Sequence, residues 1–138
     1  MYVEPVVIRP GAALLRVYAA VMDSSGLPAE ISVVVFTVSD RSALGEREDR
    51  SGPAAAEALR EAGIGSISSA LITDGRDVVE SALVDAIEAG ADLILTLGGT
   101  GVGPRDETPE GTRPVIDQEL PGVAEGLRAA GFAKVQTA

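Results

Sequence analysis

The sequence DLILTLGGTGVGPRD, residues 92–106, joins an apolar run directly to a loop that is rich in glycine. The apolar part, residues 92–97, has the length and composition of a strand buried on both faces of a parallel sheet. Glycine costs roughly 1 kcal/mol relative to alanine inside a helix or strand, so four glycines from Gly98 to Gly103 indicate unusual backbone angles. The stretch predicts a parallel strand that ends in a ligand-binding loop, and a long turn explains the glycine cluster alone about equally well.

Two earlier segments repeat the pattern of an apolar strand followed by a helix. The runs at 31–38 and 66–72 predict two more strands, of which the first begins the core. Helices are predicted over 51–60, with Ser51 as the capping residue, and over 77–90. The second helix has apolar residues at helical spacing, namely Val78, Val79, Leu83, Val84 and Ile87. This alternation predicts an α/β domain with a mainly parallel sheet covered on both faces.

The three loops that follow these strands are the expected binding region, because ligands of parallel sheets bind beyond the carboxyl ends of the strands. The loops comprise residues 39–50, 73–77 and 98–108, and we expect them to lie on one edge of the sheet. Residues 108–110 then have the cap, proline and acidic residue of a further helix start. Glycines after a parallel strand can direct several backbone N–H groups at a phosphate, and Arg105 can add a bidentate contact.

Two familiar nucleotide-binding motifs are excluded by the same loop. A Walker A loop needs Gly-Lys followed by Ser or Thr, whereas Gly103 is followed by Pro104 and Arg105. A dinucleotide fingerprint has its glycines directly after the first strand, where they open the helix. Here the glycines follow the third predicted strand and stop before Thr108, so an ordinary NAD site is disfavoured as well.

The composition of the 138-residue chain limits the chemistry that these loops can supply. The chain has no His and no Cys, which excludes disulfides, thiolate metal sites and an imidazole base. Carboxylates, hydroxyls, Arg, Lys, backbone amides and a hard metal ion remain, and oxygen ligands favour Mg²⁺. The net charge of −10 argues against a general nucleic-acid or anionic-membrane surface.

The length suits one domain, and residues 1–30 are predicted to be an N-terminal extension of a domain at 31–138. No apolar run approaches the roughly 20 residues that a membrane span requires. The longest candidate, residues 12–22, is broken by Arg16 and lacks a basic start, so it is a poor signal peptide and predicts a short helix or part of the extension. We therefore expect a cytoplasmic protein that does not bind membranes.

Acidic residues stand in two of the predicted loops. Asp74 lies between Thr73 and Gly75 just after the second strand, and Asp106 follows Arg105 after the glycine cluster. Each has a purely structural explanation, because Asp commonly forms turns and carboxylates are favoured at helix entries. Together, beside a phosphate-type loop, the two carboxylates are candidates to hold Mg²⁺.

A charge cluster follows the first strand, at Asp40, Arg41, Arg47, Asp49 and Arg50. In most proteins such a cluster is a solvated loop with compensating charges, and we favour that interpretation for Arg47 and Arg50. Asp40 and Arg41 are better binding candidates because they stand directly at the end of the strand.

Several stretches, in the same order, resemble the MoaB/Mog family of molybdenum cofactor biosynthesis proteins. They are TVSDR at 37–41, residues 45–53, GGTG at 98–101, PRDETPE at 104–110 and LPG at 120–122. The combination of GGTG with a following RD-x-TPE is specific, and the resemblance covers about residues 31–138.

This resemblance implies a three-layer α/β/α domain whose enzymatic members transfer AMP from MgATP to molybdopterin and release pyrophosphate. It implies Asp74 and Asp106 as the catalytic acidic groups, which would also hold Mg²⁺ or fix the pterin ring. The residues that it implies for binding the pterin phosphate or the nucleotide are Ser39, Asp40, Gly98, Gly99, Thr100, Gly101, Arg105 and Thr108. It further implies a homotrimer or a higher homo-oligomer.

Two alternatives remain open from the sequence. A non-catalytic module of the same fold would bind molybdopterin without transferring AMP, and a generic phosphosugar-binding α/β domain would have no affinity for the pterin. Family members usually continue through a further strand, so residues 31–138 are expected either to be C-terminally incomplete or to lack part of the active face. Glu107 stands where the family more often has an apolar residue, and Gly111 stands where it more often has Ala. These differences affect only the expected details of substrate specificity.

Overall fold

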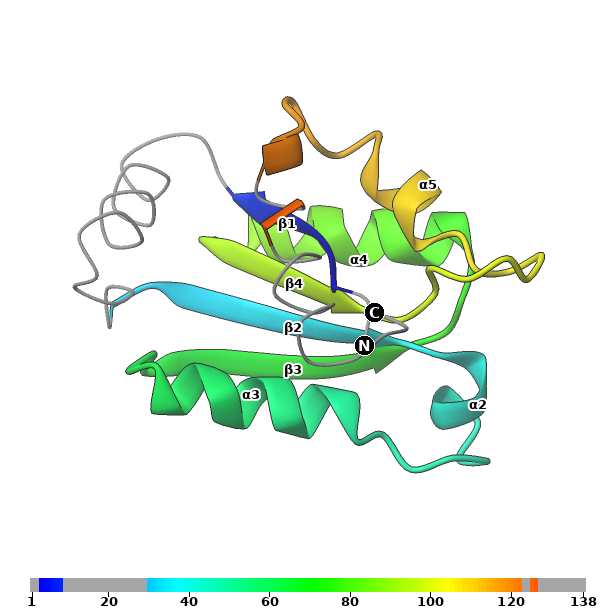
Figure 1. The fold of residues 1–138 in the computed structure, drawn as a ribbon, viewed down its shortest axis with the longest axis horizontal. Helices are drawn as coiled ribbons and strands as arrows, with labels where there is room; N and C mark the ends of the chain where they lie inside the picture. Colours follow the sequence, from blue (N-terminus) through cyan, green and yellow to red (C-terminus); the bar gives the residue numbers. More distant parts are fainter. Residues whose placement is uncertain (1–2, 9–29, 123–124, 127–138) are drawn as a thin grey trace.

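A four-stranded sheet organises the computed structural model, which describes residues 3–8, 30–122 and 125–126. In chain order the strands are β1 (Val3–Ile8), β2 (Ser32–Val38), β3 (Ser66–Ile72) and β4 (Leu93–Leu97). Their order across the sheet is β1-β4-β2-β3 (Figure 1). β2 runs parallel to both β3 and β4, whereas β1 is antiparallel to β4, so the predicted mainly parallel sheet is confirmed.

Helices cover both faces of this sheet (Figure 1). The described helices are, in chain order, α2 (Asp40–Ala43), α3 (Ser51–Glu61), α4 (Arg76–Glu88) and α5 (Thr108–Thr112), of which α2 lies beyond the carboxyl end of β2 and not on a face. α3 packs on one face, and α4 packs on the other with α5 beside it, which is the expected three-layer α/β/α arrangement. None of the helices that the structure describes is long and apolar enough to cross a membrane.

β2 contributes to two separate cores because successive side chains of a strand point to opposite faces of the sheet. Val33 and Val35 are fully buried on the face that α3 covers. Phe36 and Val38 are buried on the other face, where they pack with Leu83 of α4. Burial on both faces explains why the sequence of this strand is continuously apolar and does not alternate.

β1 is a strand that the interpretation of residues 1–30 as an extension missed, so β2 is the second strand along the chain and not the first. The pairing of β1 with β4 shifts register between Glu4 and Val7, around Pro5. Proline lacks an N–H donor and occurs only at sheet edges or bulges, so VEPVVI suits the edge position that it occupies. The helix predicted for residues 12–22 lies outside the described residues.

Two local features also differ from the prediction. The loop after β2 contains the short helix α2, which Ser39 caps by accepting a hydrogen bond from the Ser42 backbone N–H (3.3 Å). A helix of four residues is too short for an apolar periodicity to reveal it. Ser51 begins α3 but does not cap it, because Asp49 Oδ1 accepts from the backbone N–H groups of Ser51 (3.0 Å) and Gly52 (3.1 Å).

The strand order creates a switch point at the carboxyl ends of β2 and β4. The chain passes from β2 to β3 on one side of β2 and then returns to β4 on the other side. The connecting loops diverge at such a point, and ligands of open α/β sheets bind there. Figure 1 shows the carboxyl ends of β2, β3 and β4 at the same end of the sheet, on the right in that view.

Candidate functional site

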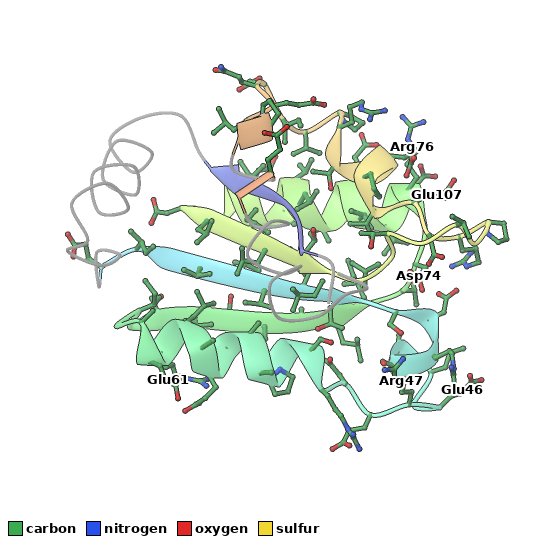
Figure 2. The ribbon with its side chains drawn as sticks, viewed as in Figure 1. Glu46, Arg47, Glu61, Asp74, Arg76 and Glu107 are labelled. Carbon is green, nitrogen blue, oxygen red and sulfur yellow. The ribbon has the colours of Figure 1, made fainter. Side chains whose placement is uncertain are left out.

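A pocket of about 390 Å³ lies at the carboxyl ends of β2 and β4. All three loops that the sequence analysis placed on one edge contribute to it, and its wall consists of residues 37–42, 47–51, Asp74, 97–100 and Asp106. Figure 2 shows Asp74, Arg47 and Glu107 at this end of the molecule, whereas Glu61 lies at the opposite end of α3. The predicted meeting of the three loops is confirmed.

The structure brings most of the predicted site residues together. Those that line the pocket are Ser39, Asp40, Asp74, Gly98, Gly99, Thr100 and Asp106. Gly101, Arg105 and Thr108 do not line it. Thr108 is fully buried and its hydroxyl donates to the carbonyl of Gly98 (3.0 Å), so its contacts in this structure hold the glycine loop in place.

The first two glycines of the loop have positive φ angles, 100° at Gly98 and 63° at Gly99. A Cβ on Gly98 would overlap the carbonyl oxygen of Val38, and one on Gly99 would overlap the Thr108 hydroxyl. The backbone N–H of Thr108 also donates to the Gly99 carbonyl (2.9 Å). The positive φ angles and the close approach of neighbouring atoms therefore explain why both positions are glycine, and binding of a phosphate by their backbone N–H groups would be an additional role.

Asp74 lies in the turn after β3, and its two carboxylate oxygens have different surroundings. Oδ2 accepts a hydrogen bond from the backbone N–H of Asp40 (2.6 Å). Oδ1 is buried and has no hydrogen-bond partner among the described residues, and a Cβ added to Gly99 would lie 3.1 Å from it. An unpaired buried oxygen is costly, so Asp74 Oδ1 is the strongest candidate in the pocket for a ligand or metal contact.

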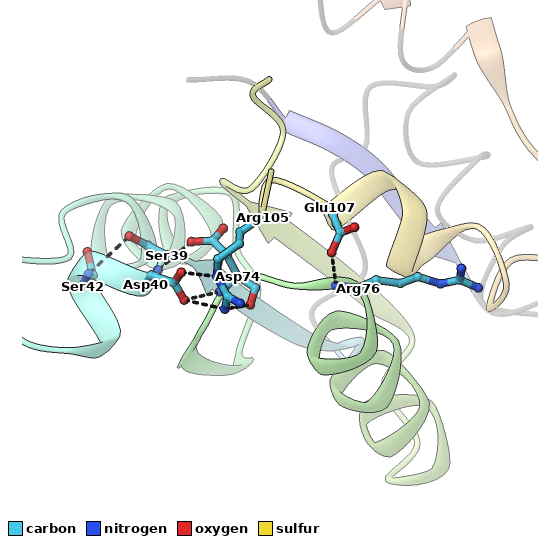
Figure 3. A network of polar contacts seen from close by, with 7 residues as sticks. All are labelled: Ser39, Asp40, Ser42, Asp74, Arg76, Arg105 and Glu107. Carbon is cyan, nitrogen blue, oxygen red and sulfur yellow. Dashed lines mark hydrogen bonds and ion pairs between the residues drawn. The ribbon is translucent and has the colours of Figure 1, made fainter. Parts of the chain in front are cut away.

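Asp40 and Arg105 form an ion pair beside this turn (Figure 3). Arg105 Nε donates to Asp40 Oδ2 (2.6 Å), and Arg105 Nη2 donates to Asp40 Oδ1 (3.1 Å) and to the Asp74 carbonyl (2.6 Å). The side-chain hydrogen bond from Arg105, helped by the Asp74 backbone N–H, holds the pKa of Asp40 below its ordinary value of 3.8. Asp40 is therefore ionised at neutral pH and its charge is balanced by Arg105.

Asp106 closes the tip of the glycine loop. Its Oδ2 accepts from the backbone N–H of Gly103 (2.9 Å), and its own N–H donates to the Gly103 carbonyl (3.1 Å). These are the turn-forming contacts that Asp commonly makes. The residue also lines the pocket, as Asp74 does.

Asp49 and Thr37 were not among the predicted site residues, although both line the pocket. Gly52 permits their close packing, because a Cβ at that position would lie 2.6 Å from Asp49 Oδ2 and 2.7 Å from Thr37 Oγ1. The spacing Asp-x-Ser-Gly before a helix is a capping signal that identifies Asp49 in retrospect. Arg47 and Arg50 line the pocket too, and both are exposed.

The carboxylates of the pocket are spread over several loops. Among the residues that the structure describes, no group of three or more acidic, His or Cys side chains is arranged to hold a metal ion. Mg²⁺ usually takes only one or two protein carboxylates and completes its shell with water and substrate phosphates. Asp74, with its unpaired Oδ1, and Asp106 fit that limited role.

Comparison with known proteins identifies the type of domain. The model of a family described as a probable molybdopterin binding domain matches residues 34–137. A molybdopterin adenylyltransferase of Pyrococcus furiosus is 43% identical over 101 residues, which make up 73% of this chain and 59% of that protein. A molybdenum cofactor biosynthesis bifunctional protein of Synechococcus elongatus is 39% identical over 107 residues, 78% of this chain and 34% of that protein. The chain thus spans only part of the length of these curated relatives.

A solved structure has the same fold. The molybdopterin biosynthesis Mog protein from Mycobacterium ulcerans matches with a TM-score of 0.69 and 44% sequence identity. The match covers 78% of this chain and 70% of that chain. Identity at this level relates the two chains by family as well as by fold.

Proposed function

Because the chain belongs to the family of probable molybdopterin binding domains, we propose that it acts in molybdenum cofactor biosynthesis as an adenylyltransferase, transferring AMP from MgATP to molybdopterin. The observation that carries the proposal is the common pocket of Gly98, Gly99, Asp74 and Asp106. It contains the glycine loop and both carboxylates that the resemblance assigned to phosphate binding and catalysis.

The proposed reaction joins a phosphate oxygen of molybdopterin to the α-phosphorus of ATP. The bond from that phosphorus to the bridging oxygen of the β-phosphate breaks, and pyrophosphate leaves. The step needs in-line geometry and neutralisation of phosphate charge, for which neither His nor Cys is required.

The groups of the pocket suit these needs. Arg41 and Arg47 are exposed residues of the pocket lining that can meet phosphate charge, whereas Arg50 of the same loop is paired with Glu48. Asp74 and Asp106 would hold Mg²⁺, which when bound supplies further neutralisation of phosphate charge. Carboxylate and arginine groups on different loops thus offer places for both the metal and the phosphates of the substrates.

Incubation of the full chain with molybdopterin and radiolabelled ATP tests the proposal. We expect the label to appear in adenylylated molybdopterin when ATP carries it at the α-phosphate, and in pyrophosphate when ATP carries it at the γ-phosphate. Pterin retained by the protein without any label would instead identify a non-catalytic binding module. A protein without affinity for the pterin would exclude both functions.

We also propose a cytoplasmic homotrimer or higher homo-oligomer. The family resemblance supports this assembly, and so does the exposure of large apolar side chains at Leu44 (71%) and Leu71 (40%), which contact between copies would bury. Light scattering of the full chain should give at least three times the mass of one chain. A monodisperse monomer would exclude the oligomer.

A further inference from the structure

Asp40, Asp74 and Arg105 connect three loops that come from three different strands (Figure 3). The backbone N–H of Asp40 donates to Asp74 Oδ2 (2.6 Å), and the backbone N–H of Asp74 donates to Asp40 Oδ1 (3.1 Å). Arg105 adds its two hydrogen bonds to the Asp40 carboxylate and one to the Asp74 carbonyl. We call this set of five hydrogen bonds the interlock.

Two of the three guanidinium nitrogens of Arg105, Nε and Nη2, donate to protein groups. Both oxygens of Asp40 accept from it, in the fork geometry that pairs a guanidinium with a carboxylate. Arg105 does not line the pocket, although its neighbour Asp106 does. A phosphate contact through Nε or Nη2 would break the pairing with Asp40. Because those two nitrogens are engaged and Arg105 lies outside the pocket lining, the geometry favours a structural role over the direct phosphate contact expected from the sequence.

The interlock fixes the direction of the Asp74 carboxylate. Since Oδ2 is held by the Asp40 N–H, Oδ1 is left in its buried position, where it has no hydrogen-bond partner among the described residues. The next residue, Gly75, has a φ of 124°, and glycine gives a turn wide conformational freedom. The orientation of Asp74 therefore depends on partners from outside its own turn.

We propose that Arg105 is a positioning residue, which holds Asp74 in its place in the pocket through the Asp40 carboxylate and through its own hydrogen bond to the Asp74 carbonyl, and does not bind the phosphate of either substrate. The inference rests on the proposed adenylyl transfer. Displacement of a reacting or binding group by about 1 Å can slow a reaction roughly 100-fold, so a contact outside the pocket can still control the rate.

A double-mutant cycle with Arg105→Gln, Asp40→Asn and the combined variant tests the proposal. We expect each single change to lower kcat roughly 10- to 100-fold, with the KM values for MgATP and molybdopterin changed by less than about threefold. The combined variant should be no slower than the slower single variant, because both changes break one interlock. An increase in KM at unchanged kcat, or effects that multiply, would make Arg105 a direct ligand and overturn the proposal.

Two further variants show whether the loss of kcat comes from the charge of Arg105, from its planar fork or from any change of an exposed arginine. Arg60→Gln is the matched control: Arg60 is as exposed as Arg105 (58% against 60%) and is also paired, with Glu57 at 3.1 Å, but lies on α3. Its kcat should equal that of the wild type. Arg105→Lys keeps the charge but cannot form the planar fork, so we expect it to be as slow as Arg105→Gln. Full activity of the Lys variant would contradict the proposal.

Amide hydrogen exchange provides a measurement that does not depend on activity. The Asp74 N–H donates to the Asp40 carboxylate that Arg105 holds, so its exchange should be faster in Arg105→Gln than in the wild type and Arg60→Gln. Unchanged protection of Asp74 would overturn the proposal whatever the activity. If exchange increases as expected but the wild-type protein forms no adenylylated molybdopterin, the proposed function fails and the positioning role of Arg105 stands.

Discussion

Gly98 is constrained twice, by its backbone angle and by the space around it. Its φ of 100° lies in a region that side chains disfavour. A Cβ would also overlap the carbonyl oxygen of Val38, a main-chain atom at the end of β2. Since Val38 is paired with Ile72 of β3, that atom cannot move away as the end of a flexible side chain can.

We therefore expect Gly98→Ala to lower the free energy of unfolding by about 2 kcal/mol or more, measured by urea denaturation. Gly122→Ala is the control, because a Cβ at Gly122 meets no atom of the described residues within 4 Å, and its effect should stay below about 0.5 kcal/mol. Equal stability of the two variants would contradict the close approach of the glycine loop to β2.

The Asp40 carboxylate gives the stability of the protein a defined dependence on pH. Arg105 holds the folded-state pKa of Asp40 below its ordinary value of 3.8. A lowered folded-state pKa contributes stability that is present above the unfolded-state pKa, about 4, and is lost as the pH falls through the folded-state value. Below about pH 4 the wild type should therefore lose more stability than Arg105→Gln does. Urea denaturation gives the free energy of unfolding of both proteins at each pH. If the two curves against pH were parallel, the Asp40–Arg105 pair would make no contribution to the pH dependence of stability.

At the level of secondary structure, the start of α4 is held by a side chain from another element. Gly75 precedes the helix and offers no capping group, so the first backbone N–H groups need another acceptor. Glu107 Oε2 accepts from the backbone N–H of Arg76 (3.1 Å), as Figure 3 shows. Because Glu107 also immediately precedes α5, this contact connects the starts of both helices.

Glu107→Ala should accordingly destabilise the fold by about 1 kcal/mol, the usual effect of losing a capping acceptor. Glu88→Gln is the comparison variant, since Glu88 is the last residue of α4 and a negative charge there opposes the helix dipole. Its stability should be unchanged or slightly higher. A thermal melt in which both variants behave alike would argue against the capping role of Glu107.

Elements with a strong local pattern could be predicted from the sequence. β3 has the predicted bounds, and α4 begins within one residue of the prediction. Of the apolar positions predicted for α4, Val79 and Leu83 are fully buried, whereas Val78 and Val84 are 40% and 39% exposed. An apolar stripe thus predicts a helix and its buried side, but positions at the margins of the stripe remain partly in solvent.

Contacts between loops could not be predicted in the same way. The sequence placed Asp40, Asp74 and Arg105 at one edge of the sheet, because all three follow predicted strands. It did not indicate that they bond to one another across 34 and 65 residues of chain, since no local pattern specifies which donors and acceptors meet. β1 was missed for the same reason, because its partner β4 lies far along the chain.

In the molecule as a whole, the net charge and the strand order together determine where an anionic substrate can bind. A net charge of −10 repels anionic substrates at long range, so their binding must depend on the local arrangement of the pocket. The strand order provides that arrangement, because it directs the loops after β2, β3 and β4 to one edge. The arginines, the glycine loop and the carboxylates of Asp74 and Asp106 meet there.

The most direct measurement of the proposed adenylyl transfer compares the wild type with Asp106→Asn. The substitution keeps the shape of the side chain and removes its charge, so the fold should be intact by circular dichroism. With molybdopterin and MgATP, the wild type should form adenylylated molybdopterin and an equal amount of pyrophosphate, and the variant should lose this activity. A wild type that forms no adenylylated product would rule out adenylyl transfer, and a folded Asp106→Asn variant with unchanged turnover would rule out the role of Asp106 in it.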